Sequence, residues 1–169
     1  MENNRLERFS IVKMVRYSNW ITLIQWRIMM LYQIEDWKTV KENVQKTLNI
    51  KISREKFSVN AFDLPGTKMI KVPDFENLSD DELFQILINL HNLSGMLYVV
   101  IHICHKDGFG PFLIEANRLE GLVKNYVNIF QETFFDTNAI IISLNEKLVW
   151  MFHHSGFVGL FDYSKQLGT

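Results

Sequence analysis

The spacing of hydrophobic and polar positions changes along this chain, and the change separates expected helices from expected strands. The last third, from Thr137 to Tyr163, alternates short apolar runs with turns rich in polar residues or glycine. Short β-branched and aromatic runs interrupted in this way are typical of an antiparallel meander. We therefore expect three consecutive strands, near 139–144, 148–154 and 157–163.

Elsewhere the apolar residues return every three or four positions, which is the spacing of an amphipathic helix. This spacing predicts helices near 37–48, 79–92 and 115–134. The second helix begins with the strongest local signal in the chain, because Ser79 and Glu82 match a capping box. In that motif the serine accepts a backbone hydrogen bond at the helix start and the glutamate reaches back to the serine.

Further apolar runs complete the expected fold. The run near 97–104 predicts a fully buried strand, and the runs at 57–62 and 69–72 predict a short hairpin. Consecutive strands at the end of the chain argue against a repeating parallel βαβ arrangement. We expect an α+β fold in which residues 1–169 form a single domain, a mainly antiparallel sheet with a C-terminal β-meander covered by helices. Residues 5–34 have a looser helical spacing.

The composition is that of a globular protein, with 47% hydrophobic and 22% charged residues and a net charge of −1. Basic residues are densest in the N-terminal third but alternate with acidic ones, which favours a solvated helical face over nucleic-acid binding. The apolar stretch Ile21–Leu31 is too short to span a bilayer and contains Arg27. The single cysteine, Cys104, and the missing signal-peptide pattern indicate a cytoplasmic protein without membrane association.

No sequence motif for nucleotide binding, zinc hydrolysis or serine nucleophiles occurs, so we expect no cofactor and no catalytic residue. Cys104 lies within an apolar run, where a thiol is normally unreactive. The histidines leave one alternative open, a metal-dependent hydrolase that uses His102 or His105 together with His153 or His154. Side chains alternate along a strand, so each pair would offer only one histidine to a common site, and no metal site is expected.

An acidic cluster lies around the start of the second helix. Capping, complementarity to the helix dipole and solubility explain such a cluster without any partner. The functional interpretation is a charged patch that docks a basic protein. Because Glu82 belongs to the capping box, the candidate partner-binding residues are Asp74, Glu76, Asp80 and Asp81.

The segment from Ala139 to Asp162 resembles the C-terminal pattern of small bacterial immunity proteins from polymorphic-toxin and contact-dependent-inhibition loci. That pattern is a strand, a turn, a strand carrying tryptophan, then histidine and glycine before a last strand. The corresponding features here are Ile140–Ser143, Trp150, His153-His154, Gly156 and Phe157–Asp162.

The resemblance implies a protein that binds and neutralises one cognate toxin, for instance a nuclease, without turnover. Trp150, His154 and Gly156 have structural explanations as a core ring, a strand-end polar group and a tight turn. They are therefore not taken as functional residues. A non-catalytic scaffold protein is a further alternative.

Overall fold

The computed structural model describes residues 32–59, 62, 69–106 and 108–164. By their contacts, the residues divide into two compact units, Met1–Gln33 and Ile34–Thr169. The second unit holds nearly all the described residues. The expected helical region 5–34 lies outside them except at its last three positions. The single domain over residues 1–169 therefore stays a prediction.

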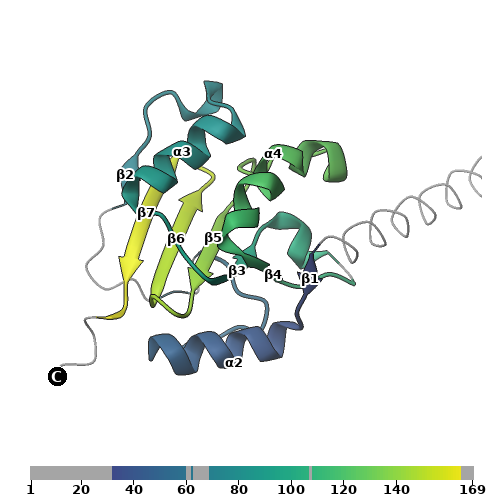
Figure 1. Ribbon diagram of the computed structural model, residues 1–169, viewed down its shortest axis with the longest axis vertical. Coiled ribbons are helices and arrows are strands. Elements are labelled where there is room, and N and C mark those ends of the chain that lie inside the picture. The colour runs from purple at the N-terminus through teal and green to yellow at the C-terminus, as the bar shows by residue number, and fades with distance from the viewer. Residues whose placement is uncertain (1–31, 60–61, 63–68, 107, 165–169) are drawn as a thin grey trace, which may run out of the picture. The chain divides into compact units, whose positions relative to one another are not determined.

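The described strands form one seven-stranded antiparallel sheet in the order β1-β4-β3-β5-β6-β7-β2 (Figure 1). The strands are β1 (Gln33–Ile34), β2 (Ile70–Lys71), β3 (Met96–Val100), β4 (Phe112–Glu115), β5 (Ala139–Ser143), β6 (Leu148–His153) and β7 (Phe157–Asp162). The predicted C-terminal meander is confirmed, because β5, β6 and β7 are consecutive neighbours. Each of these strands ends one residue earlier than expected.

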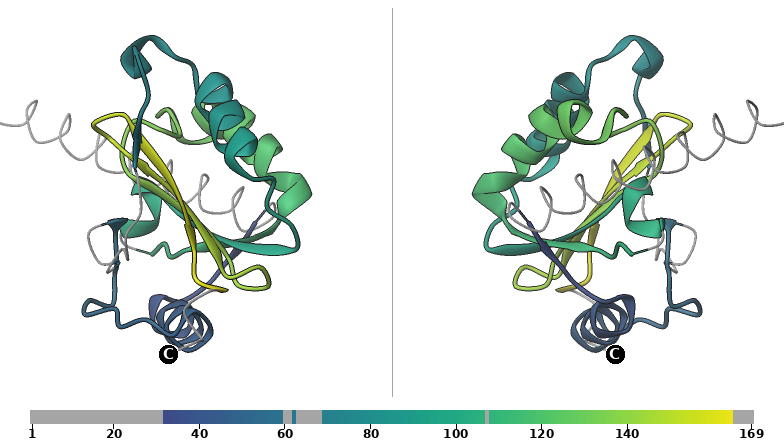
Figure 2. Two further views of the ribbon diagram at one scale, coloured as in Figure 1. Left: turned by 90° about the vertical axis from the view of Figure 1, so that its left-hand side faces the viewer. Right: turned by 90° about the vertical axis from the view of Figure 1, so that its right-hand side faces the viewer.

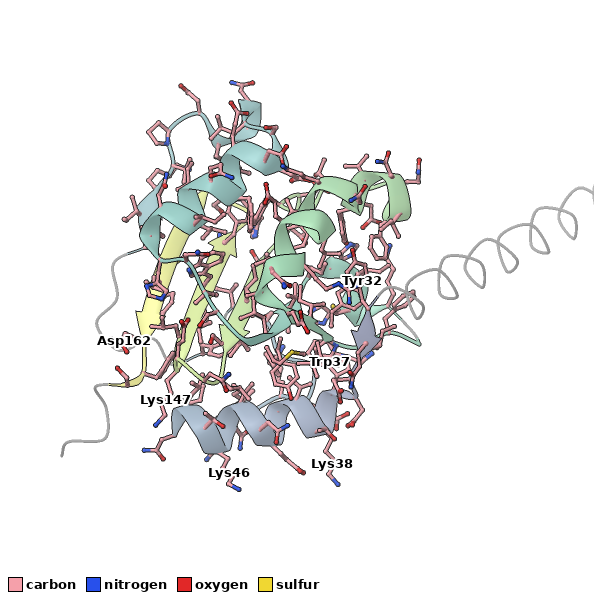
Figure 3. All side chains as sticks on the ribbon, viewed as in Figure 1. Tyr32, Trp37, Lys38, Lys46, Lys147 and Asp162 are labelled. Atoms are coloured by element: carbon pink, nitrogen blue, oxygen red, sulfur yellow. The ribbon has the colours of Figure 1, made fainter. Side chains whose placement is uncertain are left out.

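Helices cover both faces of this sheet (Figure 2). The helices α3 (Asp80–Leu90) and α4 (Leu119–Phe130) lie on one face, and α2 (Trp37–Leu48) lies on the other. Trp37 points from α2 towards the sheet, whereas Lys38 and Lys46 point away from it (Figure 3). Every residue of β5 is buried, and four of the five are apolar. Because both faces of the sheet are covered, apolar and polar residues do not alternate along this strand.

The capping box at the start of α3 is present. The Ser79 hydroxyl oxygen accepts a hydrogen bond from the backbone N–H of Glu82 at 3.3 Å, and the Glu82 carboxylate accepts one from the Ser79 N–H at 2.8 Å. The helix α2 has the predicted bounds. The helix α4 is shorter than the predicted 115–134 at both ends. A 3-10 turn at Ala116–Arg118 follows β4 and precedes it, and Gln131 ends it with a left-handed backbone (φ 61°).

Two strand predictions differ from the structure. The strand near 97–104 is present, but it ends at Val100, and His102–His105 form a 3-10 turn. A contact with α2 stabilises this turn, because the Trp37 indole N–H donates a hydrogen bond to the Cys104 carbonyl at 3.3 Å. Of the predicted hairpin, the strand near 69–72 is present as β2 but pairs with β7. No strand occurs at Phe57–Val59, and residues 60–61 of the other predicted strand lie outside the described residues.

Trp150 lies in the core between the sheet and α3, as expected from its place on an apolar strand. Its side chain is 1% exposed, and its ring meets Phe84 of α3 edge-on with centroids 6.3 Å apart. The indole N–H has no hydrogen-bond acceptor among the described residues. A chain of aromatic ring contacts runs from α4 through the segment that follows it to β6, namely Tyr126, Phe130, Phe134, Phe135 and Phe152.

Candidate functional site

Two places in the fold collect the polar side chains that the sequence singles out. The first is the acidic segment that enters α3. A short 3-10 turn, Phe75–Asn77, leads through Ser79 into the helix. Asp74 precedes this turn with a left-handed backbone (φ 50°), a conformation that aspartate tolerates better than most residues.

Asp80 has an internal structural role that the sequence does not reveal. Its carboxylate accepts hydrogen bonds from the backbone N–H groups of Phe134 at 2.7 Å and Phe135 at 3.1 Å. These bonds hold the chain that follows α4 against the first turn of α3. No local pattern predicts them, because donor and acceptor are 54 and 55 positions apart.

Glu82 is likewise occupied by its own helix start. Hydrogen bonds from the Ser79 backbone N–H and hydroxyl lower the pKa of its carboxyl group. Three exposed carboxylates remain, those of Asp74, Glu76 and Asp81, which we call the acidic rim. Within the described part of the chain, none of the three forms a hydrogen bond or an ion pair.

The histidines form the second place, and the 3-10 turn changes their expected arrangement. On a strand, His102 and His105 would point to opposite sides, but residues three positions apart in a 3-10 helix eclipse one another. Both therefore line one cavity of about 190 Å³ at the end of β3, which we call the histidine cavity. Its other lining residues are Ser58, Val100, Thr137, Asn138 and Ile140.

His154 is linked to this cavity through Asn138. The Asn138 side-chain oxygen lies 2.9 Å from the backbone nitrogen of His154 and 3.0 Å from its ring Nδ1. The rings of His153 and His154 lie in a tilted contact, with centroids 4.2 Å apart. Partial burial, followed by the neighbouring His154, lowers the pKa of His153.

A charged group flanks the cavity. Glu132 contacts His102 Nδ1 at 3.2 Å and Lys106 Nζ at 2.7 Å. Partial burial opposes the ionisation of Glu132, but the hydrogen bonds from Lys106 and His102 outweigh it and lower its pKa. The pKa of His105 is lowered by burial and then by the positive charges of Lys56 and His102.

The described residues contain no group of three or more His, Cys, Asp or Glu side chains that could hold a metal ion. Cys104 is fully buried, and burial raises the pKa of its thiol to about 12. A thiol that stays protonated in this way is a poor nucleophile.

A larger and more open hollow of about 550 Å³ lies at the other end of β3. It is lined by polar loop residues that include Asn92, Asn117 and Asn145. Beside it, Glu146 accepts a hydrogen bond from the Ser94 hydroxyl at 2.7 Å and lies 3.6 Å from His91. These contacts tie the β5–β6 turn to the loop that follows α3.

In comparisons with known proteins, no family model, no curated protein and no solved structure matches this chain. Among the described residues, no helix is both long enough and apolar enough to cross a membrane. The apolar stretch 21–31 lies outside those residues.

Proposed function

We propose that this protein is an inhibitor of the immunity type, which neutralises a cognate bacterial toxin by protein–protein contact in the cytoplasm. The observation that carries the proposal is the acidic rim. Asp80 and Glu82 are used inside the fold, whereas Asp74, Glu76 and Asp81 present their charge to solvent from the same segment. The resemblance of the C-terminal meander to immunity proteins supports the same class.

The rim suits a partner with a basic surface, such as a toxin that cleaves nucleic acid. An enzyme that binds phosphates carries positive charge around its active site, and carboxylates placed there compete with the substrate. Complementary charge mainly accelerates association and weakens with salt. The hydrogen bonds at Ser79 and Asp80 fix the start of α3, so little conformational entropy is lost when a partner docks there.

The test starts with the product of the neighbouring gene. That product is made in a bacterial host with and without this chain, and growth is measured. We expect the chain to restore growth and to form a 1:1 complex with the toxic product in solution. If no neighbouring product is toxic, or if growth stays arrested when the chain is present, the proposal is wrong.

The role of the rim is then tested with charge-reversed variants. Glu76→Lys combined with Asp81→Lys should slow association roughly tenfold at low salt and much less at high salt. Glu42→Lys reverses a single charge on α2, on the opposite face of the sheet, and should leave the rate nearly unchanged, whereas Glu76→Lys or Asp81→Lys alone should each slow it. Equal association rates for the rim variant and Glu42→Lys would show that the acidic rim is not part of the binding surface. Asp80 is left intact because its carboxylate holds Phe134 and Phe135.

A metal-dependent hydrolase is the second candidate, since His102 and His105 share a cavity that Asn138 connects to His154. It predicts purified protein that retains near-stoichiometric metal and loses activity on chelation. Elemental analysis separates the two candidates. An inhibitory binding protein requires no retained metal.

A further inference from the structure

The histidine cavity has a donor-rich lining that the acidic rim does not explain. Five of its seven lining residues are polar, and none of the seven carries a carboxylate. Ser58 and Thr137 contribute hydroxyl groups, and His102 and His105 contribute imidazoles. Val100 and Ile140, at the adjoining ends of β3 and β5, are the two apolar members.

Asn138 adds a further hydrogen-bond donor to the cavity, its side-chain NH₂, because its side-chain oxygen already contacts His154. Its side-chain oxygen faces both the backbone N–H and the ring Nδ1 of His154. The amide NH₂ is the group of Asn138 that stays available, and it can only donate. His154 thus acts as a positioning residue for Asn138.

The charge around the cavity is positive in balance. Glu132 faces His102, and Lys106 compensates the charge of this carboxylate. Lys56 lies close enough to His105 to lower its pKa. Glu132 and Lys56 thus act directly on the two imidazoles, and Lys106 acts on Glu132. Two lysines against one carboxylate favour an anion over a cation.

From this lining and charge we propose that the histidine cavity binds a phosphate group, either free phosphate or the phosphate of a small phosphomonoester. Phosphate oxygens accept hydrogen bonds from hydroxyl, amide and imidazole N–H donors, which are the groups gathered here. The volume of about 190 Å³ is below the roughly 300–1,000 Å³ of pockets for drug-sized ligands, so the ligand is small.

Binding of the anion depends on pH in a defined direction. Burial, Lys56 and His102 lower the pKa of His105 in the free protein, and a bound phosphate favours its protonated form, so affinity rises as pH falls towards that pKa. Glu132 keeps its charge over this range, since the hydrogen bonds from Lys106 and His102 lower its pKa. Sulfate is the suitable probe for this effect, because it stays doubly charged while phosphate itself changes charge near pH 7.

The experiment titrates the full chain with inorganic phosphate, sulfate and glycerol phosphate, and follows the histidine ring signals by NMR and the heat by calorimetry. We expect the signals of His102 and His105 to shift and that of His91 to stay. His91 pairs with Glu146 beside the hollow at the other end of β3 and serves as the internal control. Tighter binding of glycerol phosphate than of phosphate would identify a phosphomonoester as the ligand, and equal or weaker binding would identify free phosphate.

Two variants separate anion binding from folding. Asn138→Asp keeps an oxygen for His154 but replaces the donor NH₂ by a carboxylate oxygen, so it should weaken anion binding at least tenfold. His105→Gln should weaken binding and remove most of the pH dependence seen with sulfate. His91→Gln should change neither.

The proposal is overturned if the His102 and His105 signals do not move at millimolar anion. It is also overturned if His91 moves equally, because that outcome indicates general screening by salt. Unchanged affinity in a folded Asn138→Asp variant would overturn it as well. Folding of each variant is checked by its melting temperature.

Discussion

The hairpin β5–β6 and the connection between β3 and β4 belong to neighbouring parts of one sheet, yet they satisfy their backbones in different ways. β5 and β6 form five consecutive residue pairs from Ala139↔Phe152 to Ser143↔Leu148, with the core on both faces. The connection instead leaves the sheet at Ile101, makes a 3-10 turn and returns as β4.

We expect this difference to separate the residues that stabilise the fold from those that bind ligands or protons. A regular ladder uses its own backbone polar groups, so its side chains need only be apolar and well packed. An irregular turn carries polar side chains out to solvent, and here it brings His102 and His105 to the cavity and Lys106 to Glu132. We expect changes in the hairpin to affect unfolding, and changes in the connection to affect ligands and pH response.

The largest effect is expected at Trp150, in the centre of β6. Trp150→Ala removes a ring that is 1% exposed and leaves a cavity against Phe84, which should cost about 3–5 kcal/mol of unfolding free energy. Denaturation with urea measures this loss. A urea midpoint close to that of the wild type would show that Trp150 and the hairpin do not contribute most to the stability of the fold.

Trp150→Phe is the matched control. It keeps an aromatic ring and removes an indole N–H that has no acceptor among the described residues. The unfavourable burial of that N–H disappears in the variant, which offsets part of the lost ring volume. The variant should therefore be clearly more stable than Trp150→Ala.

The second effect concerns Asp80, which joins two elements that are distant in sequence. Asp80→Ala leaves the N–H groups of Phe134 and Phe135 without their charged acceptor and should cost about 2–4 kcal/mol. Asp81→Ala, one position on, removes an exposed carboxylate and should change stability by less than about 0.5 kcal/mol. Equal losses for the two variants would mean that the bonds of Asp80 contribute no stability.

Asp80 also shows which features of this fold sequence reasoning can predict. The start of α3, the bounds of α2 and the meander all follow from patterns within a few residues, and all three were confirmed. The roles of Asp80 and Asn138 depend on partners that only the tertiary fold brings close.

The end of β3 was mispredicted for the same reason. Residues 97–104 are apolar enough for a continuous strand, but a hydrogen bond from Trp37 of α2 holds the turn at Cys104. β4 has only four residues, too few for its periodicity to distinguish it from the start of the next helix. The grouping of His102 with His105 therefore becomes visible only in the structure.

A smaller effect is expected at Ser79. Ser79→Ala removes the hydroxyl that caps the N–H of Glu82 and should lower stability by about 1 kcal/mol. The association rate with a partner should hardly change, since the acidic rim keeps its charges. A large loss of association in this variant would show that the rim depends on an intact cap.

The smallest expected effect is a pH dependence of stability that originates at His105. Burial, Lys56 and His102 lower the pKa of His105 in the folded state, whereas in the unfolded chain it lies near 6.5. Near pH 6 the unfolded state therefore binds more protons, so the unfolding free energy falls as pH drops below about 6.5. His153 acts in the same direction, because burial and His154 lower its pKa too. Glu132 acts in a separate, more acidic range, since a lowered carboxyl pKa gives stability that is lost only as pH falls through that value.

Urea midpoints between about pH 7.5 and pH 5.5 separate these contributions. His105→Gln should flatten the decline seen in the wild type, and His153→Gln should flatten it independently. Sulfate should flatten the decline in the wild type but not in His105→Gln, since an anion in the histidine cavity raises the pKa of His105 back towards that of the unfolded chain. A decline that is identical in the wild type and both variants would exclude these histidines as its source. Neither His105 in the connection nor His153 at the end of β6 would then contribute a pH response to the stability of the fold.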